Sequence, residues 1–280
     1  MIDLHTHSTV SDGSYTPTEL VEYAYEKGLK ALALTDHDDI AGVEEAKRCA
    51  ENFHIELVPG IEFSTEHKGQ PFHMVGLFID TKNKELLSAL EYIKSDRARR
   101  NEKIISALNK MDMDIELKEV EAISGGGVIS RAHFAAVLKQ KGYVKSYNEA
   151  FDRFLGDGKS AYVKREAVTA PEAISLIHRS GGIAVIAHPL IYRLSERRLL
   201  QLIEALKELG VDAIEAYYSS HRPSDTRKIK EYAQRYGLLL SGGSDFHGSV
   251  KPGLDLGTGY GKLCVPDEVL EKLRGRLNGG

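Results

Sequence analysis

The chain has 280 residues, of which 42% are hydrophobic, and its formal net charge is −4. This length allows one large α/β domain or a domain with an insertion, and the apolar content excludes a disordered chain. The negative charge argues against a protein that holds long duplex nucleic acid on a basic face, but it permits a small anionic substrate. The apolar runs are short, so we expect a cytoplasmic protein without a membrane span or signal peptide.

The first predicted element is a short strand that ends in two histidines. Residues 2–4 have strand character and lead into His5 and His7. Side chains at the carboxyl ends of parallel barrel strands gather on one face, where barrel enzymes carry their chemistry. An isolated His-x-His pair can also arise by chance in a loop, so the rest of the chain must decide whether this pair belongs to a metal site.

Helices and strands then alternate. The expected elements are a helix from a capping box at Thr16 to about Lys27, a strand over 30–35, a helix over about 41–52 and a strand over 55–58. Potential ligands accompany this βαβαβ order, because Asp12 follows the first strand, His37 the second and Glu62 the third.

A hairpin is predicted after Glu62. The apolar run 72–79 is preceded by Lys68 and Gly69, which suit a turn. If the turn is centred there, His73 lies opposite Ser64 and on the same face as Glu62. A shift of one residue would turn His73 to the other face, so this pairing depends on the assumed register.

The alternation stops between about residues 82 and 166, where the sequence becomes long, charged and helical. We expect an inserted helical subdomain that caps the active site, while residues 1–81 and 167–280 form the barrel domain. The segment 125–127, three glycines, is predicted to be a flexible joint. Ser130 follows as the N-cap of a helix that opens with Arg131 and His133, a suitable place for a phosphate. Arg131 can alternatively be a solvated surface charge.

The alternation of strands and helices resumes after residue 167. The expected elements are a helix from a capping box at Thr169 to about Arg179, a strand over 183–187, a helix over about 196–209, a strand over 213–217, a helix over about 225–236 and a strand over 238–240. His188 follows the first of these strands, and Asp245 and His247 follow the last.

Nine potential metal ligands therefore lie at or near strand ends: His5, His7, Asp12, His37, Glu62, His73, His188, Asp245 and His247. Imidazoles and carboxylates without thiolates suit Mn²⁺, Fe²⁺ or Zn²⁺ better than a dedicated Ca²⁺ or Mg²⁺ site. Nine ligands are too many for one ion, so we expect two or three divalent ions.

These motifs, in this order, resemble those of the PHP family, the polymerase and histidinol phosphatase superfamily. The resemblance is carried by His5-Thr6-His7-Ser8, Thr35-Asp36-His37, Gly60-Ile61-Glu62, His73, Ala187-His188-Pro189 and Ser244-Asp245-Phe246-His247. It implies a distorted (β/α)7 barrel with a trinuclear site. By this resemblance one ion is held by His5, His7, Glu62 and Asp245, a second by Glu62, His73 and His188, and a third by Asp12, His37 and His247.

The helical insertion resembles that of the family branch that acts on nucleotides, which includes 3′,5′-nucleoside bisphosphate phosphatases and 5′-to-3′ RNases. The implied activity is a phosphoesterase in which a hydroxide bridging two metal ions attacks phosphorus in line. The expected partner is a small phosphorylated substrate, a nucleotide or the 5′ end of a short RNA, and not a membrane. The expected substrate-binding residues are Ser130, Arg131, His133, Lys164 and Arg193. For His133 the family also suggests a metal-ligand role, but its position in the insertion favours substrate contact.

The expected catalytic residues are His37, His247 and Asp245. His37, His247 or a metal-bound water can protonate the leaving oxygen, and the sequence does not separate these sources. Two other functions are considered, namely hydrolysis of histidinol phosphate or another small phosphomonoester, and an inactive metal- or nucleotide-binding module. The module is disfavoured because every ligand position is filled.

Overall fold

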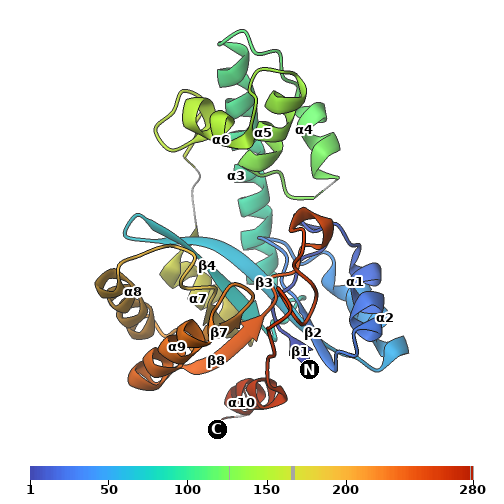
Figure 1. Cartoon of the computed structure of the whole chain (residues 1–280), viewed down its shortest axis with the longest axis vertical. Helices are drawn as coiled ribbons and strands as arrows, with labels where there is room; N and C mark the ends of the chain where they lie inside the picture. Colours follow the sequence, from blue (N-terminus) through green and yellow to red (C-terminus); the bar gives the residue numbers. More distant parts are fainter. Residues whose placement is uncertain (126, 165–167, 278, 280) are drawn as a thin grey trace. The chain divides into compact units, whose positions relative to one another are not determined.

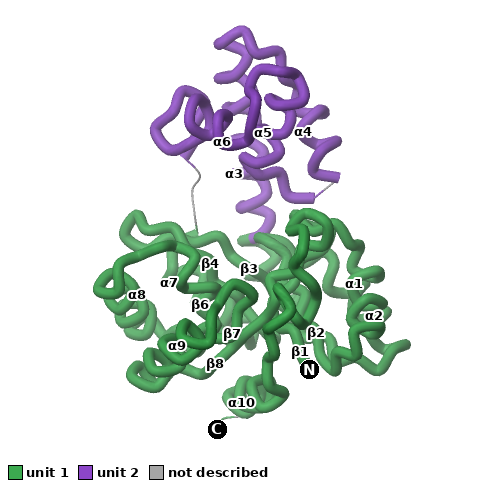
Figure 2. Tube along the Cα trace, viewed as in Figure 1, with its two compact units in different colours: residues 1–89, 167–280 green, residues 90–166 purple. Residues whose placement is uncertain are grey.

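The structure is a computed structural model that describes residues 1–125, 127–164, 168–277 and 279. It divides into two compact units, residues 1–89 with 167–280 (unit 1) and residues 90–166 (unit 2) (Figure 2). The strands are β1 (Ile2–Asp3), β2 (Ala31–Leu34), β3 (Glu56–His67), β4 (Gln70–Leu77), β5 (Val168–Thr169), β6 (Ile183–Ile186), β7 (Ala213–Tyr218) and β8 (Leu239–Gly243). The helices of unit 1 are α1 (Pro17–Glu26), α2 (Val43–Phe53), α7 (Ala170–Arg179), α8 (Glu196–Glu208), α9 (Pro223–Tyr236) and α10 (Asp267–Leu277).

The strands of unit 1 form a barrel-shaped sheet that is nearly closed. Their order is β1-β2-β3-β4-β6-β7-β8, with the short β5 paired to β3. The first and last strands of this order also meet, because the amide of Leu4, just after β1, donates to the Gly242 carbonyl in β8 at 3.2 Å. Beyond β8, the Asp245 amide donates to the His5 carbonyl at 2.8 Å. Helices α1 and α2 cover the side of β1 and β2, and α9 lies beside β7 and β8 with α8 next to it (Figure 1). The predicted α/β barrel with a helical insertion is confirmed.

The strand sequences explain why the sheet is covered on both faces. Every residue of Ala31–Leu34 and of Ile183–Ile186 is buried, as expected for parallel strands with helices outside and a packed core inside. Inside the barrel, Leu4, Val185 and Ala213 belong to one apolar cluster that also includes Leu273 from α10. This rigid core holds the loops that follow the strands.

The predicted hairpin is confirmed in its register. Strand β4 is antiparallel to β3, and His73 pairs with Ser64. Lys68 and Gly69 form the turn with φ of 49° and 79°, a conformation that glycine adopts without strain. The strand before the hairpin is longer than expected, since β3 continues past residue 58 to His67. Glu62 therefore lies within a strand rather than in a loop after it.

The predicted capping boxes are also present. Thr16 and Glu19 cap α1, and Thr169 and Glu172 cap α7. Each box satisfies backbone donors that a helix start otherwise leaves unpaired. The short strand β5 and the helix α10 were not expected from the sequence, and α10 packs on the barrel core.

Unit 2 is helical. Its elements are α3 (Lys84–Asn109), which begins in unit 1, α4 (Leu117–Ser124), α5 (Arg131–Gln140), α6 (Tyr147–Ala150) and a π-helical turn (Phe151–Leu155). A separate apolar core that includes Leu108, Phe134 and Leu138 holds these helices together. Of the predicted joint 125–127, Gly126 lies outside the described residues, while Gly125 ends α4 with φ 62°.

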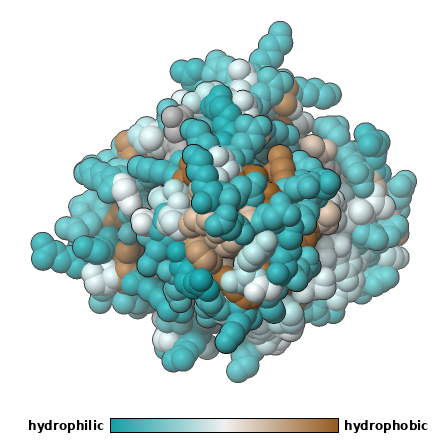
Figure 3. Space-filling model, turned by 90° about the horizontal axis from the view of Figure 1, so that it is seen from above, coloured by the Kyte–Doolittle hydropathy of each residue, from teal (hydrophilic) through white to brown (hydrophobic). Residues whose placement is uncertain are grey.

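Polar and charged side chains cover most of the face in Figure 3, and apolar side chains appear there only as small patches. Within the described part of the chain, no helix is long and apolar enough to cross a membrane.

Candidate metal centre

The structure brings together all nine predicted ligands, and all nine belong to unit 1. They form four overlapping groups, in each of which one ligand atom per residue lies within 4.8 Å of the others. The groups are His7, Asp12, His37 and His247; His5, His7 and Asp245; His5, Glu62 and His188; and His37, Glu62 and His73. Most of these residues come from the loops that follow β1, β2, β6 and β8, whereas Glu62 and His73 project from the β3–β4 hairpin.

The Glu62 carboxylate is the centre of this cluster. Its Oε2 lies 3.2 Å from His5 Nε2, 3.2 Å from His7 Nε2 and 3.1 Å from His37 Nδ1. Its Oε1 lies 2.9 Å from both His73 Nδ1 and His188 Nε2. One fully buried carboxylate thus faces the ring nitrogens of all these histidines.

Several of the facing atoms have no hydrogen-bond partner. They are His5 Nε2, His7 Nε2, His37 Nδ1 and Glu62 Oε2, all of them buried. An unpaired buried polar atom lowers the stability of the folded state, and proteins rarely keep several of them at one place. Imidazole nitrogens and a carboxylate oxygen that converge without hydrogen bonds fit divalent cations, which would occupy the lone pairs.

Outer contacts fix the orientation of two imidazoles. His5 Nδ1 lies 3.1 Å from Glu215 Oε1, and His247 Nδ1 lies 2.8 Å from the Asp245 carbonyl oxygen. Because these oxygens accept, each Nδ1 carries the proton and each Nε2 presents its lone pair to the cluster. Metal-binding histidines are commonly oriented in this way.

Asp245 is held by two side chains that the sequence did not indicate as its partners. Its Oδ2 accepts from Tyr218 Oη at 2.7 Å and from Lys251 Nζ at 2.6 Å. Its Oδ1 therefore remains for His7, whose Nε2 lies 3.3 Å away. Asp245 and His188 also have positive φ, of 57° and 28°, and such strained backbone is concentrated at functional sites.

The charge states of the histidines differ within the cluster. Burial lowers the pKa of His37 to about 3, so this imidazole is neutral and can donate a lone pair. Burial also opposes a charge on His7, but the nearby carboxylates of Asp245 and Glu62 outweigh it and raise its pKa to about 9. A metal ion bound through His7 must displace that proton, which couples metal binding to proton release.

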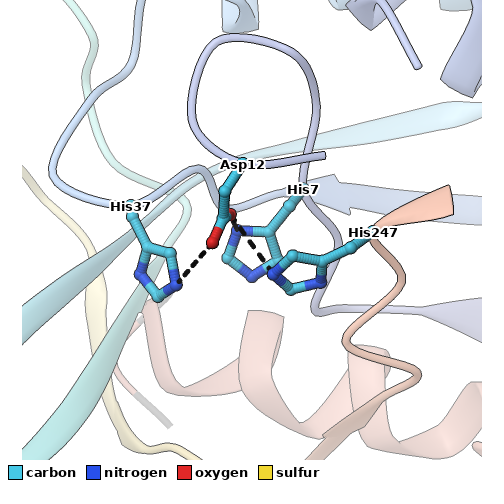
Figure 4. A group of neighbouring side chains, drawn as sticks. All are labelled: His7, Asp12, His37 and His247. Carbon is cyan, nitrogen blue, oxygen red and sulfur yellow. Dashed lines mark ion pairs between the residues drawn. The ribbon is translucent and has the colours of Figure 1, made fainter. Parts of the chain in front are cut away.

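Asp12 reaches into the cluster from the loop after β1 (Figure 4). Its Oδ1 lies 3.2 Å from His247 Nε2, and its Oδ2 lies 3.9 Å from His37 Nε2. The resemblance gave the third ion to Asp12, His37 and His247, and the structure adds His7 to the same group.

We expect Asp12→Ala to lose chiefly one ion. Asp12 belongs to one of the four groups, and the other three keep all their members. Elemental analysis of the purified variant should show one ion fewer than the wild type, while exchange of the exposed Asp152 for alanine should change nothing. An equal fall of all bound metal would mean that the groups do not act as separable sites.

The predicted substrate residues fall in both units. Ser130, Arg131, His133 and Lys164 belong to unit 2, and Arg193 belongs to unit 1. The His133 ring caps α5, because its Nδ1 accepts from the Ser130 amide at 3.1 Å. Lys164 and Arg193 are exposed.

Arg131 is held by neighbours within unit 2. Its Nη1 donates to Asp157 Oδ1 at 2.9 Å and to the Leu155 carbonyl at 3.2 Å. Its guanidinium also lies 5.4 Å from the centre of the Tyr162 ring, within the range of a cation–π contact. The sequence gave no sign of the Asp157 pairing, and a phosphate at Arg131 would have to share the guanidinium with that carboxylate or displace it.

Comparison with known proteins agrees with this geometry. A family model described as PHP domain matches residues 3–160. A 5′-3′ exoribonuclease from Haemophilus influenzae is 41% identical over 245 residues, covering 88% of this chain and 89% of that protein. A 3′,5′-nucleoside bisphosphate phosphatase from Chromobacterium violaceum is 35% identical over 264 residues, covering 91% of this chain and 90% of that protein.

Solved structures show the same similarity. An amidohydrolase from Chromobacterium violaceum, solved with bound sulfate and no metal, superposes with a TM-score of 0.83 and 34% identity over 98% of this chain and 96% of that one. A proposed metal-dependent phosphoesterase from Bifidobacterium adolescentis gives a TM-score of 0.82 and 29% identity over the same shares of the two chains. The family match and the identity along most of the sequence show that this chain belongs to the PHP domain family.

Proposed function

We propose that this protein hydrolyses phosphate esters of nucleotides, as a 3′,5′-nucleoside bisphosphate phosphatase or by trimming short RNA from its 5′ end. The observation that carries the proposal is the buried Glu62 carboxylate, which faces converging imidazoles whose lone pairs have no other partner. The named activities of the similar proteins support hydrolysis of phosphoester bonds and a nucleotide substrate.

Two or three divalent ions, of Mn, Fe or Zn, would be held by the nine ligands. When bound, such ions supply a nucleophile from water at neutral pH and neutralise charge on the phosphate. The protein's own part is to hold the ligands rigidly. Glu215 and the Asp245 carbonyl orient His5 and His247, and Tyr218 and Lys251 hold Asp245.

The leaving oxygen needs a proton, and His37 and His247 are the proposed side-chain sources. His37 and His247 both face Asp12, which is partly exposed. The His247 ring donates from Nδ1 to a carbonyl, so its Nε2 is the atom that can carry a proton toward the substrate. We propose that the proton comes from His247 or His37, whichever holds no ion, or from water bound to an ion.

The two activities named for the relatives share one kind of substrate. A nucleoside 3′,5′-bisphosphate and the 5′-terminal nucleotide of a 5′-phosphorylated RNA both carry a phosphate on each side of the ribose. The metal cluster takes the phosphate under attack, so recognition of the other phosphate must come from different cationic side chains. We propose Arg131 for this role, with Ser130, His133, Lys164 and Arg193 as further contacts, and we propose that the helical insertion caps the active site.

Arg131→Ala tests the nucleotide assignment. If Arg131 binds the second phosphate, its loss removes a charge-assisted contact worth about 2 kcal/mol, or roughly a 30-fold fall in kcat/KM for adenosine 3′,5′-bisphosphate. Hydrolysis of p-nitrophenyl phosphate, which has no second phosphate, should fall much less, and metal content should not change.

Arg153 provides a matched control. It is an exposed arginine of the same unit that pairs with Glu149 at 2.6 Å and lies against the Phe154 ring, as Arg131 pairs with Asp157 and lies against Tyr162. Arg153→Ala should leave both substrates unaffected. Parallel losses in Arg131→Ala would place Arg131 on the reacting phosphate, and no loss would remove the insertion from substrate recognition.

A further inference from the structure

Unit 1 contains a cavity beside the metal cluster that the catalytic chemistry does not use. Its volume is about 380 Å³, and it is lined by Leu190, Ile191, Arg193, Ser220, His221 and Asp225. These residues come from the loops that follow β6 and β7 and from the start of α9. The volume falls within the range of pockets for small organic ligands.

One aromatic ring separates this cavity from the metal ligands. The Tyr218 ring lies 5.5 Å from the ring of His188 and 5.4 Å from the ring of His221, measured between centroids. His188 is a predicted ligand, and His221 lines the cavity. The cavity lining therefore lies within one side chain of a predicted metal ligand.

The lining combines an apolar wall with polar groups that are not engaged with one another. Leu190 and Ile191 are aliphatic, and the Ile191 side chain is 44% exposed although it is large and apolar. Among the described residues, the structure records no ion pair between Arg193 and Asp225, although both line the cavity. Asp225 uses Oδ2 to accept from the Arg222 amide at 2.9 Å, which leaves Oδ1 as a free acceptor.

The loop that carries this wall is held in a strained conformation. His188 and Arg193 both have positive φ, of 28° and 51°. Two turns, from the Ile191 amide to the His188 carbonyl at 3.1 Å and from the Arg193 amide to the Leu190 carbonyl at 3.2 Å, fix the segment between them. Non-glycine residues persist in such conformations when the surrounding structure enforces them, commonly at ligand sites.

We infer that this cavity binds the base of the nucleotide whose phosphate is hydrolysed. A base presents a flat apolar face, which Leu190 and Ile191 can cover, and N–H donors at its edge, which the Asp225 carboxylate can accept. Arg193, at the exposed rim, supplies a cation for the nucleotide's phosphates. This inference rests on the proposed nucleotide function and adds the part of the site that distinguishes a nucleotide from other phosphate esters.

Two variants in the cavity lining test the inference. Ile191→Ser removes apolar surface from an exposed position, and Asp225→Asn replaces the carboxylate while keeping an acceptor for the Arg222 amide. Leu87→Ser is the matched control, because Leu87 is a similarly exposed aliphatic residue, 41% exposed, on α3 and not in the cavity lining. The full-length, metal-loaded protein is assayed with adenosine 3′,5′-bisphosphate and with a base-free deoxyribose 3,5-bisphosphate. Binding of AMP is measured separately by calorimetry.

We expect each cavity variant to weaken AMP binding and to raise KM for the adenosine substrate by about tenfold, the size of one lost hydrogen bond to a charged group or of one lost apolar contact. The KM for the base-free substrate, and both KM values of the control variant, should change by less than about twofold.

Equal changes in KM for both substrates in the cavity variants would overturn the inference. The proposed function would still hold in that case, provided that the wild type hydrolyses the nucleotide. A wild type that hydrolyses p-nitrophenyl phosphate but no nucleotide overturns the proposed function instead. In that case AMP binding tests the cavity separately. Binding that Ile191→Ser weakens supports the base site, and absence of AMP binding to the wild type refutes it.

Discussion

Glu62→Ala should reduce hydrolysis of every phosphoester substrate by more than about 100-fold, beyond the 10- to 100-fold cost typical of losing an outer contact to a metal ligand. Glu62 belongs to two of the four ligand groups, and its two oxygens face imidazoles on both sides. Its loss therefore disables two sites at once. Elemental analysis should show the metal content of the variant falling together with its activity.

The loss of activity and metal in Glu62→Ala must be distinguished from a loss of folding. Glu62→Gln keeps the shape of the side chain and removes its charge, and Glu215→Gln alters a carboxylate that touches His5 but belongs to none of the ligand groups. With folding checked by circular dichroism, Glu62→Gln should resemble Glu62→Ala, and Glu215→Gln should lose less metal and less activity. Wild-type metal content in a folded Glu62→Ala protein would contradict the assignment of Glu62 as the shared ligand.

Removal of metal from the unaltered protein should have an effect of similar size. We expect a strong chelator to abolish hydrolysis and added Mn²⁺ to restore it, because the converging imidazoles and carboxylates suit divalent ions that would activate water. The chelator should remove the metal more easily at pH 5 than at pH 8. An imidazole must lose its proton to bind an ion, so protons compete with the metal at low pH. Activity that survives chelation with no metal left in the protein would refute metal dependence.

Local sequence patterns predicted the features that depend on nearby residues. The capping boxes at Thr16 and Thr169 set helix starts through contacts over three residues. The turn at Lys68 and Gly69 set the register that pairs His73 with Ser64. Because parallel strands end on one face of a barrel, the positions of the histidines along the chain also predicted that they would meet.

Contacts between side chains far apart in the sequence were not predictable in this way. Nothing near Lys251 signals that its ammonium holds Asp245, and nothing near Arg131 signals its pairing with Asp157. Such contacts depend on the exact path of loops, which propensity and periodicity do not define. The same holds for the extent of β3, whose second half is stabilised by pairing with β4 rather than by its own sequence.

The most direct test of the central proposal is phosphate or nucleotide release from a small panel of substrates by the Mn²⁺-loaded protein. The panel contains adenosine 3′,5′-bisphosphate, a short RNA with a 5′-phosphate, histidinol phosphate and p-nitrophenyl phosphate. We predict that kcat/KM is at least about tenfold higher for the adenosine bisphosphate or the RNA than for the other two, a preference of at least about 1.4 kcal/mol in transition-state binding. A preference for histidinol phosphate, or equal rates on all four substrates, would contradict a nucleotide-specific phosphoesterase.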